Sequence, residues 1–220
     1  MLKDRTKTEA ASPSLFSSRK TPPAAAPQTR ASHGLEQFFS SIQDEHNLSI
    51  LDFAGASQAN ITFITALGHR IYSNDVMHAM EEAFGREGDF SANQADPRRS
   101  NAFLEETLAF GEQSFDGALL WDTLQFLAPP LLEQTVEHLS RVLRPGASLL
   151  AFFHAEEKTS SAPLYSYRIL SPKTMSLTPR GNVRPTQYFN NRGLERLFQK
   201  FQSVKFFLTR DHLREIIVRR

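Results

Sequence analysis

Residues 49–75 read SILDFAGASQANITFITALGHRIYSND, and this stretch decides the fold. A short apolar run with Asp52 near its end passes into the small residues AGAS at 54–57. Small side chains there let the backbone turn sharply and approach a ligand closely. A helical pattern follows, with Gly68 placed as its C-cap, and a second apolar run ends at Asp75. The order of strand, tight turn, helix, strand and acid is typical of the first half of a nucleotide-binding α/β sheet.

The composition bounds the class of protein. A chain of 220 residues with 40% hydrophobic residues can bury one sizeable core. The formal net charge of +1 gives no overall attraction to nucleic acid or anionic lipid. The absence of cysteine excludes disulfides, thiolate metal sites and cysteine nucleophiles, and we assign no metal ligands. No apolar run approaches the roughly 18 residues of a membrane span, and no secretion signal is visible, so we expect a cytoplasmic protein without a membrane partner.

The first 33 residues differ in composition from the rest. They are rich in Ser, Thr, Ala and Pro and show no apolar period, which predicts a disordered tail over 1–33 and a single folded domain over 34–220. Basic residues outnumber acids in the tail, which would suit docking to an acidic surface. The interpretation we favour is a solvated tail.

The second strong signal is FDGALLWDTLQFL at 115–127. Its continuous apolar run predicts a buried parallel strand with Asp122 at its carboxyl end. A helix follows from Pro129, then a turn at 144–146, and a strand over 148–153 that is followed at once by His154.

The remaining segments carry weaker patterns. The polar stretch 86–100 reads as a loop, and no convincing strand lies between 76 and 114, so a third strand is short or missing. Between 155 and 192 the pattern weakens, and order returns in a helix. Two strands, 204–209 and 213–218, then close the chain, and the short join between them forces an antiparallel pair.

Together these pieces resemble the class I S-adenosylmethionine-dependent methyltransferase family over roughly 34–220. The sequence ILDF at 50–53 with Gly55 is similar to its first motif, FD at 115–116 with WD at 121–122 to its fourth-strand motif, and the RPG turn at 144–146 to the one before its fifth strand. The resemblance implies an α/β fold, a Rossmann-like methyltransferase sandwich whose mostly parallel sheet ends in an antiparallel C-terminal strand pair. It also implies S-adenosylmethionine as cofactor.

Carried over by position, the resemblance implies roles for individual residues at the cofactor site. Asp52 would orient the loop or meet the cofactor's amino group through water, and Asp75 would accept hydrogen bonds from the ribose. The alternative for Asp75 is an acid at the N-terminus of the next helix. Gln58 and Asn60 are polar groups that could bind a ligand's carboxylate or cap the helix that follows the loop, and capping is the role we expect for Asn60. The full set of cofactor-binding candidates is Asp52, Ala54, Gly55, Ala56, Ser57, Asn74, Asp75 and Trp121.

The loop itself leaves an alternative open. The family's first motif usually carries two or three glycines, whereas the loop in this chain has only Gly55. The small residues beside it, such as Ala54 and Ala56, resist a positive φ. A degenerate relative that binds no cofactor is therefore the competing interpretation.

Methyl transfer is an in-line displacement that requires a positioned and deprotonated acceptor. Asp122 and His154 lie at the ends of central strands, so Asp122 is a candidate for holding the acceptor and His154 for the base, with a packed histidine as the alternative. The chain lacks the Asn-Pro-Pro-Tyr element and the cysteine of nucleic-acid methylating enzymes, which leaves a small molecule or a peptide as acceptor. The basic, aromatic stretch 165–196 is a candidate anion-binding segment, against the favoured alternative of a solvated loop.

The sequence therefore predicts a methyltransferase acting on a small-molecule acceptor. The runner-up is a catalytically inactive methyltransferase-like interaction module, and a nicotinamide-dependent oxidoreductase ranks third because its three-glycine fingerprint is absent. The acceptor and the oligomeric state cannot be derived from the sequence.

Overall fold

The computed structural model describes residues 26–85, 89–155, 161–209 and 213–220. Its centre is a six-stranded sheet with the order β3-β2-β4-β5-β9-β8. The first four neighbours in that order run parallel, and β9 pairs antiparallel with both β5 and β8. The strands are β2 (Ser49–Asp52), β3 (Arg70–Ser73), β4 (Phe115–Trp121), β5 (Leu143–His154), β8 (Ser203–Phe207) and β9 (Leu213–Arg219). The predicted fold class, a mostly parallel sheet with an antiparallel C-terminal pair, is confirmed.

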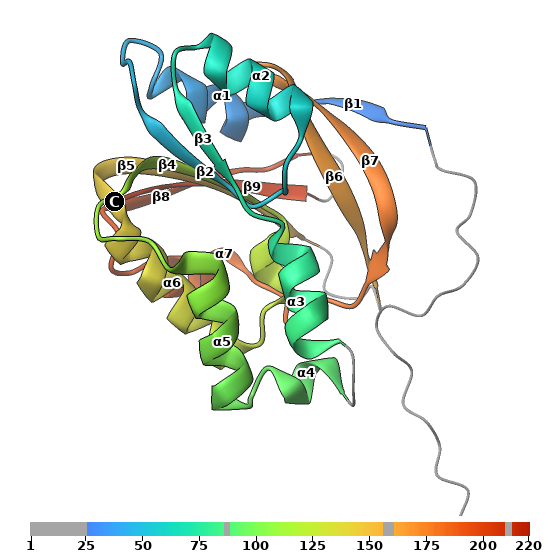
Figure 1. Ribbon diagram of the computed structural model, residues 1–220. Helices are drawn as coiled ribbons and strands as arrows, with labels where there is room; N and C mark the ends of the chain where they lie inside the picture. Colours follow the sequence, from blue (N-terminus) through green and yellow to red (C-terminus); the bar gives the residue numbers. More distant parts are fainter. Residues whose placement is uncertain (1–25, 86–88, 156–160, 210–212) are drawn as a thin grey trace, which may run out of the picture.

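Helices cover both faces of this sheet (Figure 1). On one face lie α1 (His33–Ser40) and α2 (Gln58–Ala66). The other face carries α3 (Val76–Phe84), α4 (Phe90–Asn93), α5 (Pro97–Leu108), α6 (Pro129–Val142) and α7 (Asn191–Leu197), and a 3-10 helix, Thr123–Phe126, follows β4. Among the helices that the structure describes, none has the length and apolar character needed to cross a membrane.

Each face of the sheet has its own hydrophobic core. The core with α3, α5 and α6 contains Leu51, Leu120 and Phe153, and the core with α1 contains Ile50, Leu119 and Phe152. Neighbouring residues of one strand point to opposite faces, so a sheet covered on both sides needs continuous apolar strands. This explains why the runs in β2, β4 and β5 do not alternate.

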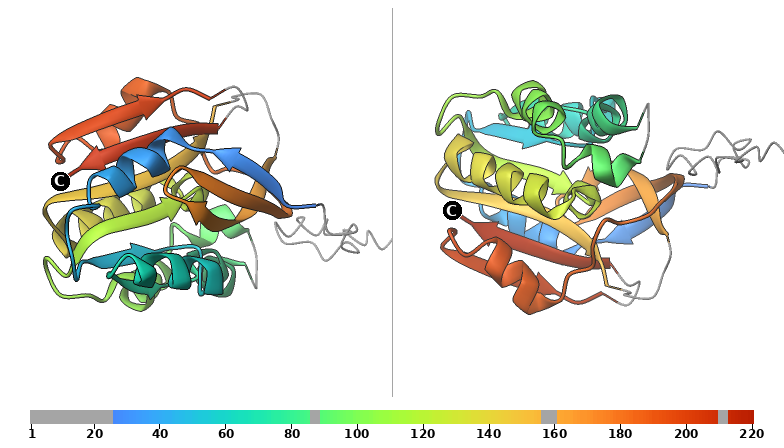
Figure 2. Two further views of the ribbon diagram at one scale, coloured as in Figure 1. Left: turned by 90° about the horizontal axis from the view of Figure 1, so that it is seen from above. Right: turned by 90° about the horizontal axis from the view of Figure 1, so that it is seen from below.

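A second, three-stranded sheet lies beside the first, with β1 (Gln28–Ala31), β6 (Ala162–Ser171) and β7 (Thr174–Val183) in the order β1-β7-β6. Figure 2 shows the orange hairpin of β6 and β7 next to the arrowheads of β2 and β4. The sequence predicted no strands here. Register shifts on both sides of 165–169 interrupt the alternation on which such a prediction depends.

The N-terminal segment also differs from the prediction. Most of the tail predicted over 1–33 lies outside the described residues, but its last part is ordered. Gln28–Ala31 forms β1 and pairs with β7. Arg30, one of the basic residues of the predicted tail, forms an ion pair with the fully buried Glu215 of β9.

Three local predictions have mixed outcomes. Between β3 and β4 the regular elements among the described residues are all helices, which agrees with the prediction of a short or missing third strand. The expected loop at 86–100 is partly wrong, because Asp89 and Asp96 cap the starts of α4 and α5, while 86–88 lie outside the described residues. The expected turn at 144–146 lies within β5, since Leu143 already pairs with Phe115 of β4.

Candidate functional site

The carboxyl ends of the four parallel strands meet at one edge of the sheet. Asp52 is the last residue of β2, and Asn74 and Asp75 follow β3. Trp121 is the last residue of β4, and His154 is the last residue of β5. Ligands of open α/β sheets bind outside this edge, so the fold brings all the predicted site residues to the expected region.

Asp52 is fully buried beneath this edge. Its Oδ1 accepts hydrogen bonds from Trp121 Nε1 at 2.6 Å and from the Ala54 amide at 3.0 Å. Its Oδ2 accepts one from Asn60 Nδ2 at 3.1 Å. Burial raises the pKa of the Asp52 carboxyl, and these three hydrogen bonds oppose that rise. Asp52 thus joins the loop after β2 to the end of β4.

The loop after β2 packs directly against Asp75. Gly55 has φ +79°, and a Cβ there would lie 3.0 Å from Asp75 Cβ and 3.1 Å from Asp75 Oδ2. The Gly55 amide donates to the Asn74 carbonyl at 3.2 Å, and Ala54 forms a β-bridge with Asp75. Both the left-handed backbone and the close approach require glycine here.

The residues that follow Gly55 lead into α2. Ala56 is exposed, and the side chain of Ser57, at the N-cap position, makes no capping hydrogen bond. The first amide groups of a helix lack intrahelical partners, so this terminus can receive a ligand's carboxylate.

Asn60 does not cap α2, contrary to our expectation. Besides Asp52, it bonds the backbone of β6: Nδ2 donates to the Tyr167 carbonyl at 3.3 Å, and Oδ1 accepts from the Ile169 amide at 2.8 Å. The fully buried Asn60 therefore ties the hairpin to the loop region. Its place inside the first turn of α2, facing β6, could not be inferred without knowing that the hairpin exists.

Asp75 caps α3, since its Oδ1 accepts a hydrogen bond from the His78 amide at 3.0 Å. The capping alternative is confirmed, and the ribose contact stays a prediction. Asn74 donates through Nδ2 to the Thr107 carbonyl of α5 at 3.1 Å, which fixes the end of β3 to a second helix.

Trp121 has a left-handed backbone with φ +53°, which is uncommon for a bulky residue and is a form of strain found at ligand sites. Its indole stacks on the phenol ring of Tyr167, with centroids 4.8 Å apart and planes 12° apart. Tyr167 was missed in the sequence as a site residue, because the segment around it was interpreted as a basic loop.

Asp122 follows Trp121 and is buried. Neither Asp122 Oδ2 nor Tyr167 Oη has a hydrogen bond of good geometry within the described part of the chain. Burial raises the pKa of the Asp122 carboxyl to about 7, and the neighbouring Tyr167 hydroxyl and the positive charge of Arg180 oppose that rise. Burial also raises the pKa of the Tyr167 phenol, as does the charge of Asp122. A carboxyl with this pKa can exchange a proton near neutral pH.

His154 lies farther along the edge. Its amide donates to Gln125 Oε1 at 3.0 Å, and its ring Nε2 lies 3.3 Å from the Pro163 carbonyl. Because Trp121 pairs with Ala151 of β5, His154 lies three residues beyond that level, or about 10 Å along the strand. The fold thus places Asp122 directly after β4 and His154 at the end of the neighbouring strand β5, at different heights along the strand direction.

Part of this sequence is similar to a known protein family. Residues 51–151 match the family model described as the methyltransferase domain, which confirms the resemblance to class I S-adenosylmethionine-dependent methyltransferases. That region runs from β2 into β5 and contains most of the site residues described above. No curated protein matches the chain.

The solved structures to which the chain is similar have low sequence identity to it. The 1,6-didemethyltoxoflavin-N1-methyltransferase of Burkholderia thailandensis, solved with 1,6-didemethyltoxoflavin and S-adenosylhomocysteine, has 13% identity and a TM-score of 0.46, covering 85% of this chain and 76% of its own. A SAM-dependent methyltransferase from Methanosarcina mazei has 15% identity and a TM-score of 0.46, with coverages of 80% and 93%. One from Aquifex aeolicus has 10% identity and a TM-score of 0.43, with coverages of 86% and 89%.

Proposed function

We propose that this protein is an S-adenosylmethionine-dependent methyltransferase whose methyl acceptor is a small molecule. The observation that carries the proposal is the contact between Gly55 and Asp75 within the region that matches the methyltransferase domain. This contact brings the glycine loop after β2 close to the acid after β3. A cofactor site needs this arrangement if one part of it is to bind an aminoacyl group and another part a ribose.

The residues at this edge fit the cofactor. The uncapped start of α2 beside Ser57 would receive the methionine carboxylate. Asp75 uses Oδ1 to cap α3, and its Oδ2 would accept a hydrogen bond from a ribose hydroxyl. Asp52 would hold the loop in position from inside the protein, since the hydrogen bonds described above all join it to other residues of the chain. The bound cofactor would supply an electrophilic methyl group.

Asp122, for which the sequence suggested a role in holding the acceptor, is here the candidate that would take the acceptor's proton in place of His154. A base is most effective when its pKa lies near the working pH, and the carboxyl of Asp122 has a pKa of about 7. His154 would be a second polar contact for the acceptor. Asp122 is buried beside the stacked rings of Trp121 and Tyr167, which supports a small acceptor rather than a macromolecule.

The test is calorimetric titration of the full chain with S-adenosylmethionine and S-adenosylhomocysteine. Asp75→Asn keeps an N-cap residue but removes the charge that faces the ribose, so we expect binding to weaken by about tenfold. Asp89→Asn, the same change at the exposed cap of α4, is the matched control and should bind like the unchanged chain. Equal affinities for both variants would contradict the proposed ribose contact, and no binding by the unchanged chain would contradict the cofactor site.

A second candidate function is a methyltransferase-like interaction module without catalysis. It is supported by the loop's single glycine, Gly55, and by the hydrogen bonds that tie β6 to Asn60 beside the loop. Ala54→Gly and Ala56→Gly separate the two candidates. If the unchanged chain binds no cofactor and the glycine variants do, the natural loop has lost this use and the second candidate is correct.

A further inference from the structure

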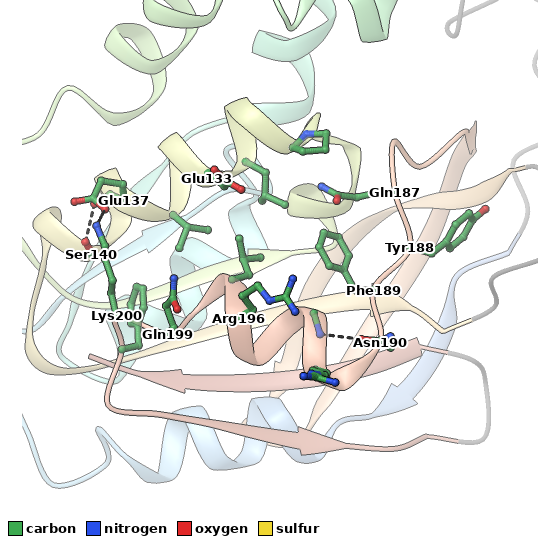
Figure 3. Close-up of a pocket in the computed structure, with 17 residues that line it drawn as sticks. Glu133, Glu137, Ser140, Gln187, Tyr188, Phe189, Asn190, Arg196, Gln199 and Lys200 are labelled. Atoms are coloured by element: carbon green, nitrogen blue, oxygen red, sulfur yellow. Dashed lines mark hydrogen bonds and ion pairs between the residues drawn. The ribbon is translucent and has the colours of Figure 1, made fainter.

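A groove of about 690 Å³ lies between α6 and α7, away from the candidate cofactor site (Figure 3). Its lining includes none of the predicted site residues, such as Asp52, Gly55, Asp75 or Asp122. Its walls come from two helices on the same face of the sheet and from the segment 187–190 that precedes α7. Its volume falls within the roughly 300 to 1,000 Å³ typical of small-molecule sites.

The floor of the groove is apolar and firmly packed. Leu132 and Val136 of α6 are buried and belong to the main core, and Phe201 is 8% exposed. Leu197 and Phe189 are partly buried against the same core. Phe189 packs edge-on against Phe153 of β5, with centroids 5.1 Å apart. Partial exposure of this floor leaves apolar surface that a ligand's hydrocarbon or aromatic body would remove from water.

One wall of the groove is cationic. Arg192 and Arg196 lie four residues apart on α7, so they project from the same side of the helix. Both are exposed groove-lining residues, and neither forms an ion pair with another residue that the structure describes. Figure 3 shows Arg196 extending between the two helices.

The opposite wall is acidic, and one of its two glutamates is neutralised. Lys200 forms an ion pair with Glu137 across the end of the groove. The charged lining residues outside this ion pair are Glu133 on α6 and the two arginines on α7. Together they leave an excess of one positive charge in the groove. This balance favours a ligand with one negative group placed toward α7 and an uncharged body toward α6.

We infer that this groove binds an amphiphilic anion, with its apolar body over Val136 and Phe189 and its carboxylate or phosphate ester held by Arg192 and Arg196. Guanidinium groups bind such oxyanions through paired, charge-assisted hydrogen bonds. A compact ligand fits better than a partner helix, because α7 has seven residues and is about 10 Å long. This inference is independent of the proposed methyl transfer.

The test is calorimetric titration of the full chain, without cofactor, using decanoate, decyl phosphate and decanol as probes. We expect both anions to bind and decanol to bind at least about tenfold more weakly, because it lacks the charge. Binding of decanoate alone or of decyl phosphate alone would identify the head group. Equal binding of decanol, or no binding of either anion, would overturn the inference.

Two variants locate the site. Arg192→Glu combined with Arg196→Glu should abolish measurable anion binding. The control is Arg98→Glu combined with Arg168→Glu, which changes the net charge by the same amount at exposed positions outside the groove lining. This control should leave anion binding unchanged. Gly193→Leu fills part of the groove. A Cβ there would meet Asn190 and Phe189 only at ordinary contact distances, and leucine favours the helix, so the melting temperature should rise while binding weakens. Undiminished binding in both groove variants would also overturn the inference.

Discussion

The indole Nε1 of Trp121 donates a hydrogen bond of 2.6 Å to Oδ1 of Asp52, and both side chains are buried. The bond joins the carboxyl ends of β4 and β2. The face of the same indole stacks on the ring of Tyr167 of β6. The Trp121 side chain therefore links two strands of the main sheet to the second sheet. The left-handed backbone of Trp121 is the conformation in which this link is made.

Replacing Trp121 with Phe should destabilise the protein by about 1 to 3 kcal/mol, because Asp52 loses its donor while staying buried. Trp121 is the single tryptophan, so unfolding in urea has to be followed by circular dichroism rather than fluorescence. Phe152→Leu, at a neighbouring ring without this hydrogen bond, is the control for lost aromatic packing. A Trp121→Phe variant no less stable than Phe152→Leu would show that the hydrogen bond contributes little.

Asp122 should make stability fall as pH rises. Its pKa is about 7 in the folded protein and about 3.8 when exposed, so above pH 4 the unfolded chain loses this proton first. The stabilising contribution is complete below pH 4 and is lost progressively up to about pH 7. Three pKa units correspond to about 4 kcal/mol, which is an upper bound for this one group.

Asp122→Asn removes this titration and should therefore become more stable relative to the unchanged chain as pH rises from 4 to 7. The difference between the two urea-unfolding free energies, measured at several pH values, is the quantity to compare. Other titrating groups, including His69 and His138, whose pKa values are lowered chiefly by burial, contribute to both proteins and cancel. A constant difference across this range would mean that the pKa of Asp122 is the same in the folded and unfolded protein.

Gly55 and Gly68 offer a matched pair for testing the loop. Both have left-handed backbones, with φ +79° and +82°, so alanine should cost each about 1 to 2 kcal/mol. At Gly55 the new Cβ would also press on Asp75, whereas at Gly68 its nearest neighbour is His46 Nδ1 at 3.8 Å. We expect Gly55→Ala to lose more stability and to lose cofactor binding. Gly68→Ala should bind normally, and equal binding by both variants would place the cofactor elsewhere.

The sequence predicted the central strands β2, β4 and β5 well because they are largely buried on both faces. Continuous apolar runs such as 118–121 leave little freedom of interpretation, and the positions of Asp52, Asp75 and Asp122 follow from where these runs end. The second sheet could not be predicted in the same way. Its burial pattern is interrupted by register shifts near Tyr165 and Ser171, so no strict alternation is visible. With the hairpin missed, the roles of Tyr167 and Asn60 were missed too, since both depend on contacts across distant segments.

Glu215 holds the N-terminal strand in place, and its loss should release that strand. The fully buried carboxylate pairs with Arg30 and accepts hydrogen bonds from Ser32 Oγ at 2.9 Å and the Gly34 amide at 2.6 Å. Glu215→Gln keeps the volume but leaves Arg30 without its countercharge, which should cost about 3 kcal/mol. Amide hydrogen exchange should then accelerate in Gln28–Ala31 while the strands of the main sheet keep their protection.

The control is Glu36→Gln on the neighbouring helix. Glu36 pairs with His33 at 3.7 Å, and both side chains are more than half exposed, so this pair should contribute less than about 0.5 kcal/mol. The two variants make the same chemical change a short distance apart, and they differ in the burial of the carboxylate. If Glu215→Gln unfolds at the same urea concentration as Glu36→Gln and exchanges at the same rate in β1, then the pairing of β1 with β7 suffices to hold this segment. In that case the buried ion pair does not anchor it.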